Sequence, residues 1–101
     1  NFEHLPQSIA QLGALQYLDL RECKRLKELP RSMRMPSLEM LNLRDCKLVD
    51  GALPEDIGCL FSLKELNLNG NNFEHLPQSI AQLGALQYLD LRECKRLKEL
   101  P

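Results

Sequence analysis

The sequence has no tryptophan, only 5% aromatic residues and no long run of apolar residues. Its uninterrupted apolar stretches contain two or three side chains at most, whereas a helix that crosses a bilayer needs about 20. The first residues also lack the basic and apolar blocks of a signal peptide. We therefore expect neither a membrane-spanning segment nor an export signal, and no membrane partner.

An excess of charge of one sign is also missing. Thirteen lysines and arginines face fourteen aspartates and glutamates, which gives a net charge of -1. No long-range field therefore attracts nucleic acid or an anionic membrane. The basic cluster over 21–34 contains Glu22 and Glu28 and has few aromatic neighbours on which bases could stack. The sequence predicts no nucleic-acid partner.

Motifs for catalysis and metal binding are absent as well. The four cysteines are widely separated, with no CxxC pair and no histidine at ligand spacing. His4 and His75 occupy copies of one position and are interpreted as surface histidines. Cys59 stands between inward positions, so we expect it to be the most exposed thiol. We predict a protein that is not an enzyme and has no metal and no cofactor.

An exact internal repeat is the most informative feature. The segments 1–30 and 72–101 are identical at every position. Such complete identity indicates either a very recent duplication or a chain assembled deliberately from a repeated cassette. In the second case the chain is one cassette, 1–71, followed by the opening segment of the next, 72–101.

A shorter period lies within this repeat. The motif Leu-x-x-Leu-x-Leu begins at Leu15, Leu38, Leu63 and Leu86, at nearly even intervals. Each motif is followed at a fixed distance by one residue of a set of four, Cys23, Cys46, Asn71 and Cys94. We expect these four side chains to point inward at the turn that follows each motif. There a cysteine acts as a small apolar group, and Asn71 forms hydrogen bonds with the backbone of neighbouring units. A Leu-Pro pair then closes each unit.

The Leu-x-Leu spacing predicts a short strand in each unit. Leu18 and Leu20 point inward, while Tyr17, Asp19 and Arg21 lie on the other face. Copies of the strand stack in parallel at about 4.8 Å, and their crossovers are right-handed. Proline begins a short helical turn on the outer side, as over 77–83. The predicted fold class is α/β: a right-handed solenoid with a short parallel β-sheet on the concave face and short helical or 3-10 turns on the convex face.

One domain, 1–101, accommodates all of these units. We divide it into a half repeat, three full repeats and a partial repeat, with the bounds 1–14, 15–37, 38–62, 63–85 and 86–101. Neither end carries a polar cap, so the sequence predicts exposed core edges at six residues, Leu5, Ile9, Leu12, Leu89, Leu91 and Leu97. Either flanking sequence covers these edges or copies associate end to end.

Polar strand positions form columns across the units, and such an uncovered sheet face is available to a protein ligand. The alternative is that the arginine and carboxylate columns merely neutralise each other. The candidate binding residues on this concave face are Tyr17, Asp19, Arg21, Glu22, Met40, Asn42, Arg44, Asp45, Glu65, Asn67, Asn69, Tyr88, Asp90, Arg92 and Glu93. Their area is small, so we expect only part of a complete recognition surface.

The complete motif, Leu-Gln-Tyr-Leu-Asp-Leu-Arg-Glu-Cys-Lys-Arg-Leu-Lys-Glu-Leu-Pro over 86–101, resembles the leucine-rich repeats of plant intracellular nucleotide-binding disease-resistance proteins of the Toll/interleukin-receptor-domain class. The resemblance implies a non-enzymatic protein-protein interaction scaffold, effector-sensing through its concave face, in the cytoplasm or nucleus. The alternative interpretation is a synthetic repeat protein built from the cassette 1–71. Such a recombinant product would self-assemble through uncapped ends and have no native ligand.

Overall fold

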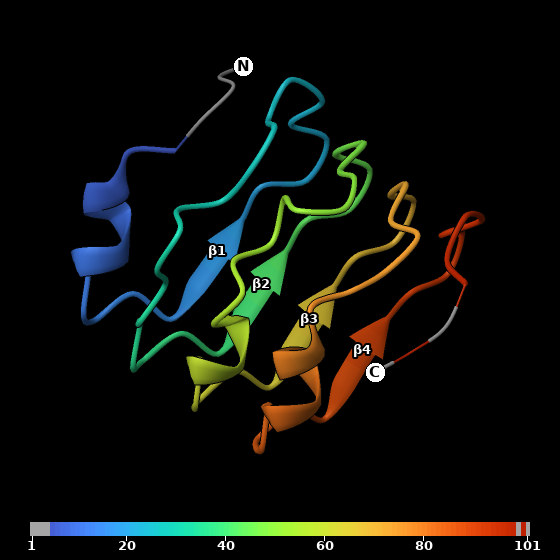
Figure 1. Ribbon diagram of the computed structural model, residues 1–101. Coiled ribbons are helices and arrows are strands. Elements are labelled where there is room, and N and C mark those ends of the chain that lie inside the picture. Colours follow the sequence, from blue (N-terminus) through green and yellow to red (C-terminus); the bar gives the residue numbers. More distant parts are fainter. Residues whose placement is uncertain (1–4, 99, 101) are drawn as a thin grey trace.

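The computed structural model describes residues 5–98 and 100, and this part of the chain contains one parallel sheet of four strands. The strands are β1 (Tyr17–Asp19), β2 (Met40–Asn42), β3 (Glu65–Asn67) and β4 (Tyr88–Asp90). They lie side by side in chain order, as Figure 1 shows. The predicted parallel stacking of the Leu-x-Leu segments is therefore confirmed. We call each strand with its return segment a coil.

Short 3-10 helices lie on the return segments. They are η1 (Gln7–Gln11), η2 (Ile57–Cys59) and η3 (Gln78–Gln82). Pro6 and Pro77 stand immediately before η1 and η3 in an extended conformation. The proline ring restricts φ, and this restriction favours the start of a helical turn. The predicted helical turn over 77–83 is confirmed, and Ile80 and Leu83 are buried. Residues 31–35, where the return segment is one residue shorter, form no helix.

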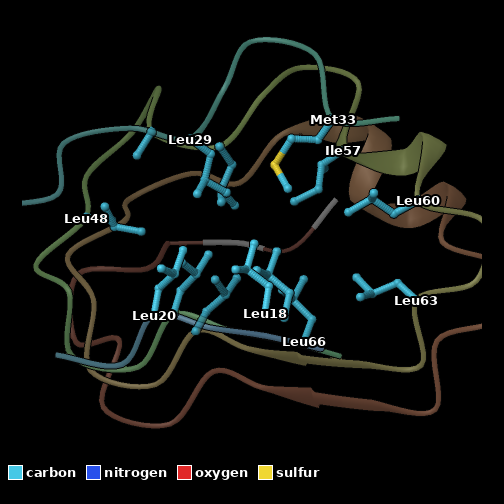
Figure 2. Packing of buried hydrophobic residues seen from close by; sticks show 14 of the residues in the cluster. Leu18, Leu20, Leu29, Met33, Leu48, Ile57, Leu60, Leu63 and Leu66 are labelled. Carbon is cyan, nitrogen blue, oxygen red and sulfur yellow. The ribbon is translucent and has the colours of Figure 1, made fainter. Parts of the chain in front are cut away.

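The hydrophobic core lies between the sheet and the return segments. Figure 2 shows Leu18, Leu20 and Leu66 of the strand side meeting residues of the opposite side such as Met33 and Ile57. The central leucine of each strand is inward because side chains alternate along a strand. The Leu-x-x-Leu-x-Leu leucines of the two middle coils are completely buried. Stacking against a coil on each side accounts for this difference from the ends.

The two ends of the stack are less completely covered. Leu12 is 51% exposed, whereas the other five predicted edge residues, Leu5, Ile9, Leu89, Leu91 and Leu97, are half-buried and packed against the core. Of the six predicted edge residues, Leu12 is exposed as predicted, whereas the other five are partly covered. A residue at an end has one neighbouring coil rather than two.

Buried polar groups connect the coils on the inner side of the turn after each strand. Asn71 is buried and donates from Nδ2 to the carbonyl oxygens of Leu43 at 2.8 Å and Leu68 at 2.9 Å. Its Oδ1 accepts the backbone N–H of Cys46 at 3.2 Å and of Leu48 at 2.9 Å. The predicted backbone-bonding role of Asn71 is confirmed.

Cysteines at the equivalent positions make a simpler contact. Cys46 Sγ donates to the Leu20 carbonyl at 3.0 Å, and Cys94 Sγ donates to the Leu68 carbonyl at 3.1 Å. Burial raises the pKa of the Cys46 thiol, so it stays protonated and able to donate. Cys59 is half-buried, as are Cys23 and Cys94, so the structure does not single it out as the most exposed thiol.

Candidate functional site

The polar face of the sheet brings the predicted binding residues together in columns. The first column runs Tyr17, Met40, Glu65, Tyr88, and the second runs Asp19, Asn42, Asn67, Asp90. This register is the one expected from the sequence. The central leucine of each strand points the other way, into the core. We call the surface formed by the fifteen predicted residues the open face.

The residues of the second column are the last residues of the four strands. In each coil the side-chain oxygen accepts the backbone N–H of the residue two positions later. The four bonds are Asp19 to Arg21 at 3.1 Å, Asn42 to Arg44 at 3.1 Å, Asn67 to Asn69 at 2.9 Å and Asp90 to Arg92 at 3.0 Å. Aspartate and asparagine form such turns readily because their side chains are short and polar. Sequence reasoning missed this structural role, which the recurrence of Asp or Asn could have indicated.

Two further columns lie beyond the strands but remain stacked through backbone hydrogen bonds. The third contains Arg21, Arg44, Asn69 and Arg92, and the fourth contains Glu22, Asp45, Gly70 and Glu93. The N–H of Glu22 donates to the Arg44 carbonyl at 2.8 Å, and that of Gly70 donates to the Arg92 carbonyl at 3.0 Å. The fourth column lies in the turn, in the left-handed region: its φ values are 60° at Glu22, 54° at Asp45, 76° at Gly70 and 62° at Glu93. These side chains are therefore presented at the end of the sheet rather than on its strands.

Six carboxylates and three arginines make the open face net acidic. Each arginine pairs with a carboxylate close in sequence. The pairs are Arg21 Nε with Asp19 Oδ1 at 3.1 Å, Arg44 Nε with Asp45 Oδ2 at 3.3 Å and Arg92 Nη2 with Asp90 Oδ2 at 2.8 Å. Neutralisation thus takes place within the first, second and fourth coils. Glu22 and Glu65 have no ion-pair partner among the described residues.

Asp90 has a different environment from the other members of its column. It is buried, and it accepts hydrogen bonds from the Arg92 side chain and, at 3.3 Å, from the Tyr88 hydroxyl. The side-chain hydrogen bond from Arg92 holds the pKa of Asp90 well below its usual range, although burial acts in the opposite direction. Asp90 therefore remains ionised at neutral pH and fixes the Arg92 guanidinium.

Hydrogen-bond donors remain available in the middle of the open face. The side-chain amide nitrogens of Asn42 and Asn67 have no partner among the described residues, whereas Asn69 Nδ2 lies 3.5 Å from Asp90 Oδ1. Across the second, third and fourth coils the face carries a shallow hollow of about 350 Å³. Its seven lining residues are Arg44, Asn67, Asn69, Tyr88, Asp90, Arg92 and Glu93. Exposed tyrosine, amide donors and paired charges suit contact with a polar protein surface.

Groups for other chemistry are not brought together in the described part of the chain. It contains no cluster of three histidine, cysteine, aspartate or glutamate side chains that could hold a metal ion. His75 is exposed, as expected, and its backbone N–H donates to Asp50 at 3.1 Å; His4 lies outside the described residues. Over the same residues no helix has the length and apolar character needed to cross a membrane.

Comparison with known proteins also identifies a repeat region in this chain. A family model described as "Leucine-rich repeat region" matches residues 32–101. The TMV resistance protein N of Nicotiana glutinosa is 54% identical over 99 residues, which is 95% of this chain and 9% of that protein. The Arabidopsis thaliana disease resistance protein RPP2A is 38% identical over 95 residues, 93% of this chain and 7% of that protein. The chain therefore spans less than a tenth of the length of these relatives.

Proposed function

Because this chain belongs to the leucine-rich repeat family and is similar to plant disease resistance proteins, we propose that its open face binds a protein ligand. The observation that carries the proposal is the contrast between the two sides of the sheet. The inner side is filled by the leucine core, while the strand residues of the other side, apart from Asp90, stay exposed or half-exposed. Uncovered parallel sheets are unusual in isolated domains, since both faces are normally packed.

The architecture suits this role as part of a longer recognition surface. We propose that the coils continue as a right-handed solenoid whose concave side is the open face, and that this segment contributes to pathogen-effector sensing in an immune receptor. Stacking repeats in this way extends a binding surface in proportion to their number. A standard interface needs about 800 Å² on each partner, more than four strands of three residues present.

A reducing compartment, cytoplasm or nucleus, agrees with the way the cysteines are used. Cys46 and Cys94 both donate from Sγ to a carbonyl oxygen of the preceding coil. A thiol can donate only while it is reduced, and disulfide formation would remove that contact. All four cysteines are free in this structure.

Substitution of the open face tests the proposal. A triple variant, Tyr17→Ala, Arg44→Ala and Glu65→Ala, removes exposed side chains and leaves the turn-forming residues of the second column intact. The matched control is Gln11→Ala, Glu55→Ala and Gln82→Ala, at exposed positions on the return segments. We expect photo-crosslinking in plant-cell extract, read by mass spectrometry, to identify a protein captured by the native chain and the control.

Capture of that protein should fall at least about tenfold for the open-face variant, while circular dichroism shows both variants to be folded. A partner retained equally by the open-face variant would contradict the proposal, and so would the absence of any protein whose capture depends on this face. Crosslinks mapped to the tryptic peptide that contains Tyr17 provide an independent measurement of the same contact.

Self-association is the second candidate function, and the sheet edges favour it. The N–H groups of Leu20, Leu43 and Leu68 each donate to the next coil, whereas that of Leu91 has no backbone acceptor among the described residues. Leu12 at the opposite end is exposed, so each end leaves groups that head-to-tail stacking into open chains would cover. Sedimentation velocity over a wide concentration range tests it: growing species support stacking, and a concentration-independent monomer contradicts it.

A further inference from the structure

A basic hollow is lined by residues of the segments that follow β1 and β2, and none of its lining residues belongs to the open face. Figure 1 shows these two segments as neighbouring loops. The volume of the hollow is about 490 Å³, and its lining residues are Lys24, Arg25, Leu26, Lys27, Lys47 and Val49. The four charged residues are all basic and exposed, and buried Leu26 lies beneath them. We call this surface the basic hollow. Its charge is opposite in sign to that of the open face.

The lysines of the basic hollow lack counter-ions within the described chain. Lys24, Lys27 and Lys47 form no ion pair with any described residue, although their neighbour Arg25 has a partner. The acidic residue next to Val49, Asp50, is engaged elsewhere: its Oδ1 accepts the backbone N–H groups of Glu74 at 2.7 Å and His75 at 3.1 Å. An anionic group from outside the described chain would therefore meet unneutralised charge.

The duplicated sequence provides a comparison for two of these lysines. Lys95 and Lys98 are the copies of Lys24 and Lys27. There, Lys95 Nζ lies 3.6 Å from Glu93 Oε1, and Lys98 Nζ lies 3.8 Å from Glu74 Oε1. Glu74 also accepts a hydrogen bond from the Arg96 side chain at 3.1 Å. Among the described residues, the two lysines are thus paired with carboxylates at the last coil, whereas their copies Lys24 and Lys27 are not.

An exposed aliphatic side chain makes the basic hollow better suited to a peptide than to a nucleic acid. Val49 is 54% exposed beside the lysines, and the lining contains no aromatic residue on which a base could stack. We propose that the basic hollow binds an acidic segment of a protein partner, with carboxylates on Lys24, Lys27 and Lys47 and an aliphatic side chain against Val49. Opposite charges steer such an encounter and orient the bound segment.

Fluorescence anisotropy with the full chain tests the proposal. The probe is a fluorescein-labelled peptide of alternating glutamate and leucine, compared with the same peptide carrying glutamine in place of glutamate. The double variant Lys24→Glu with Lys27→Glu has a matched control, Lys95→Glu with Lys98→Glu, that changes the same sequence and the same net charge at the other copy. Thermal unfolding establishes that both variants are folded.

Binding of the acidic peptide should weaken about tenfold or more in the Lys24/Lys27 variant and less than about threefold in the Lys95/Lys98 control. The glutamine peptide should bind at least about tenfold more weakly to the native chain. Equal weakening in both variants would show non-specific attraction and overturn the proposal. So would tighter binding of a labelled single-stranded RNA of equal charge, which would assign the basic hollow to nucleic acid.

Two further measurements define the contact and separate it from the open face. Val49→Ser should weaken the leucine-containing peptide but leave a peptide of glutamate and serine unchanged; equal effects on both would remove Val49 from the contact. The open-face variant at Tyr17, Arg44 and Glu65 should retain full peptide binding. If it does not, the peptide binds the open face and the basic hollow is not its site.

Discussion

Asn71 and Leu48 lie on neighbouring coils and are joined by a buried hydrogen bond of 2.9 Å from the Leu48 backbone N–H to Asn71 Oδ1. This bond is one of four that Asn71 makes to backbone groups of its own and the neighbouring coil. A single side chain thereby serves polar groups that cannot reach water. Where a cysteine takes this place, as at Cys46, the side chain only donates.

Replacement of Asn71 by alanine should lower the free energy of unfolding by about 3 kcal/mol, because the N–H groups of Cys46 and Leu48 lose a buried acceptor. Urea denaturation followed by circular dichroism measures the change. Asn71→Cys should be less damaging than Asn71→Ala, since a thiol restores the donor to the Leu43 carbonyl. Exposed Asn72→Ala is the control, with an expected change within about 0.5 kcal/mol. An Asn71→Ala variant as stable as this control would contradict the role assigned to the amide.

The duplicated aspartates Asp19 and Asp90 should respond differently to the same substitution. Asp90→Asn removes the charge of a buried carboxylate that holds Arg92, so we expect a loss of about 1–2 kcal/mol at pH 7. Asp19 is exposed, and Asp19→Asn should cost less than about 0.5 kcal/mol. Equal losses for the two variants would show that burial of Asp90 has no energetic consequence.

Stability at acid pH should depend on Asp90 as well. Its pKa is lower in the folded chain than in the unfolded chain, so the unfolded state binds more protons as the pH falls through about 4. The stabilisation from Asp90 is therefore complete above that pH and is lost below it. Urea unfolding between about pH 6 and pH 2.5 should show a shallower decline for Asp90→Asn than for the native chain. Asp50 and Glu74 also have lowered pKa values, which keeps some decline in both.

Glycine at position 58 allows η2 and η3 to pack against each other. A Cβ on Gly58 would overlap the backbone oxygen of Ser79 and lie 3.1 Å from Gln82 Cβ. Gly58→Ala should therefore destabilise the protein by about 2 kcal/mol or more, as overpacking does in other cores. Gly84→Ala is the matched control, since no atom lies within 4 Å of its Cβ position. Thermal unfolding of the two variants distinguishes them, and a Gly58→Ala chain as stable as Gly84→Ala would refute close packing of these turns.

Much of the fold was predictable because its signals are local and periodic. The Leu-x-Leu spacing identified the strands, and the unit length identified which residues of successive strands lie opposite one another, such as Tyr17 and Met40. Proline at position 77 predicted the turn that became η3. The length of the strands was not predictable in the same way. Each ends after three residues because an aspartate or asparagine side chain accepts the backbone N–H two positions later, as at Asp19.

The identical segments 1–30 and 72–101 separate the effects of sequence from those of tertiary structure. Both copies form the strand Tyr-Leu-Asp, the helix Gln-Ser-Ile-Ala-Gln and a left-handed turn, with φ of 60° at Glu22 and 62° at Glu93. Sequence alone determined these local conformations, because backbone sterics and short-range hydrogen bonds act within a few residues. Stacking decided that Asp90 is buried while Asp19 is exposed, and it placed Lys98 beside Glu74 of the preceding coil. Burial and charge pairing depend on which coil lies alongside, and that neighbour is set by the fold.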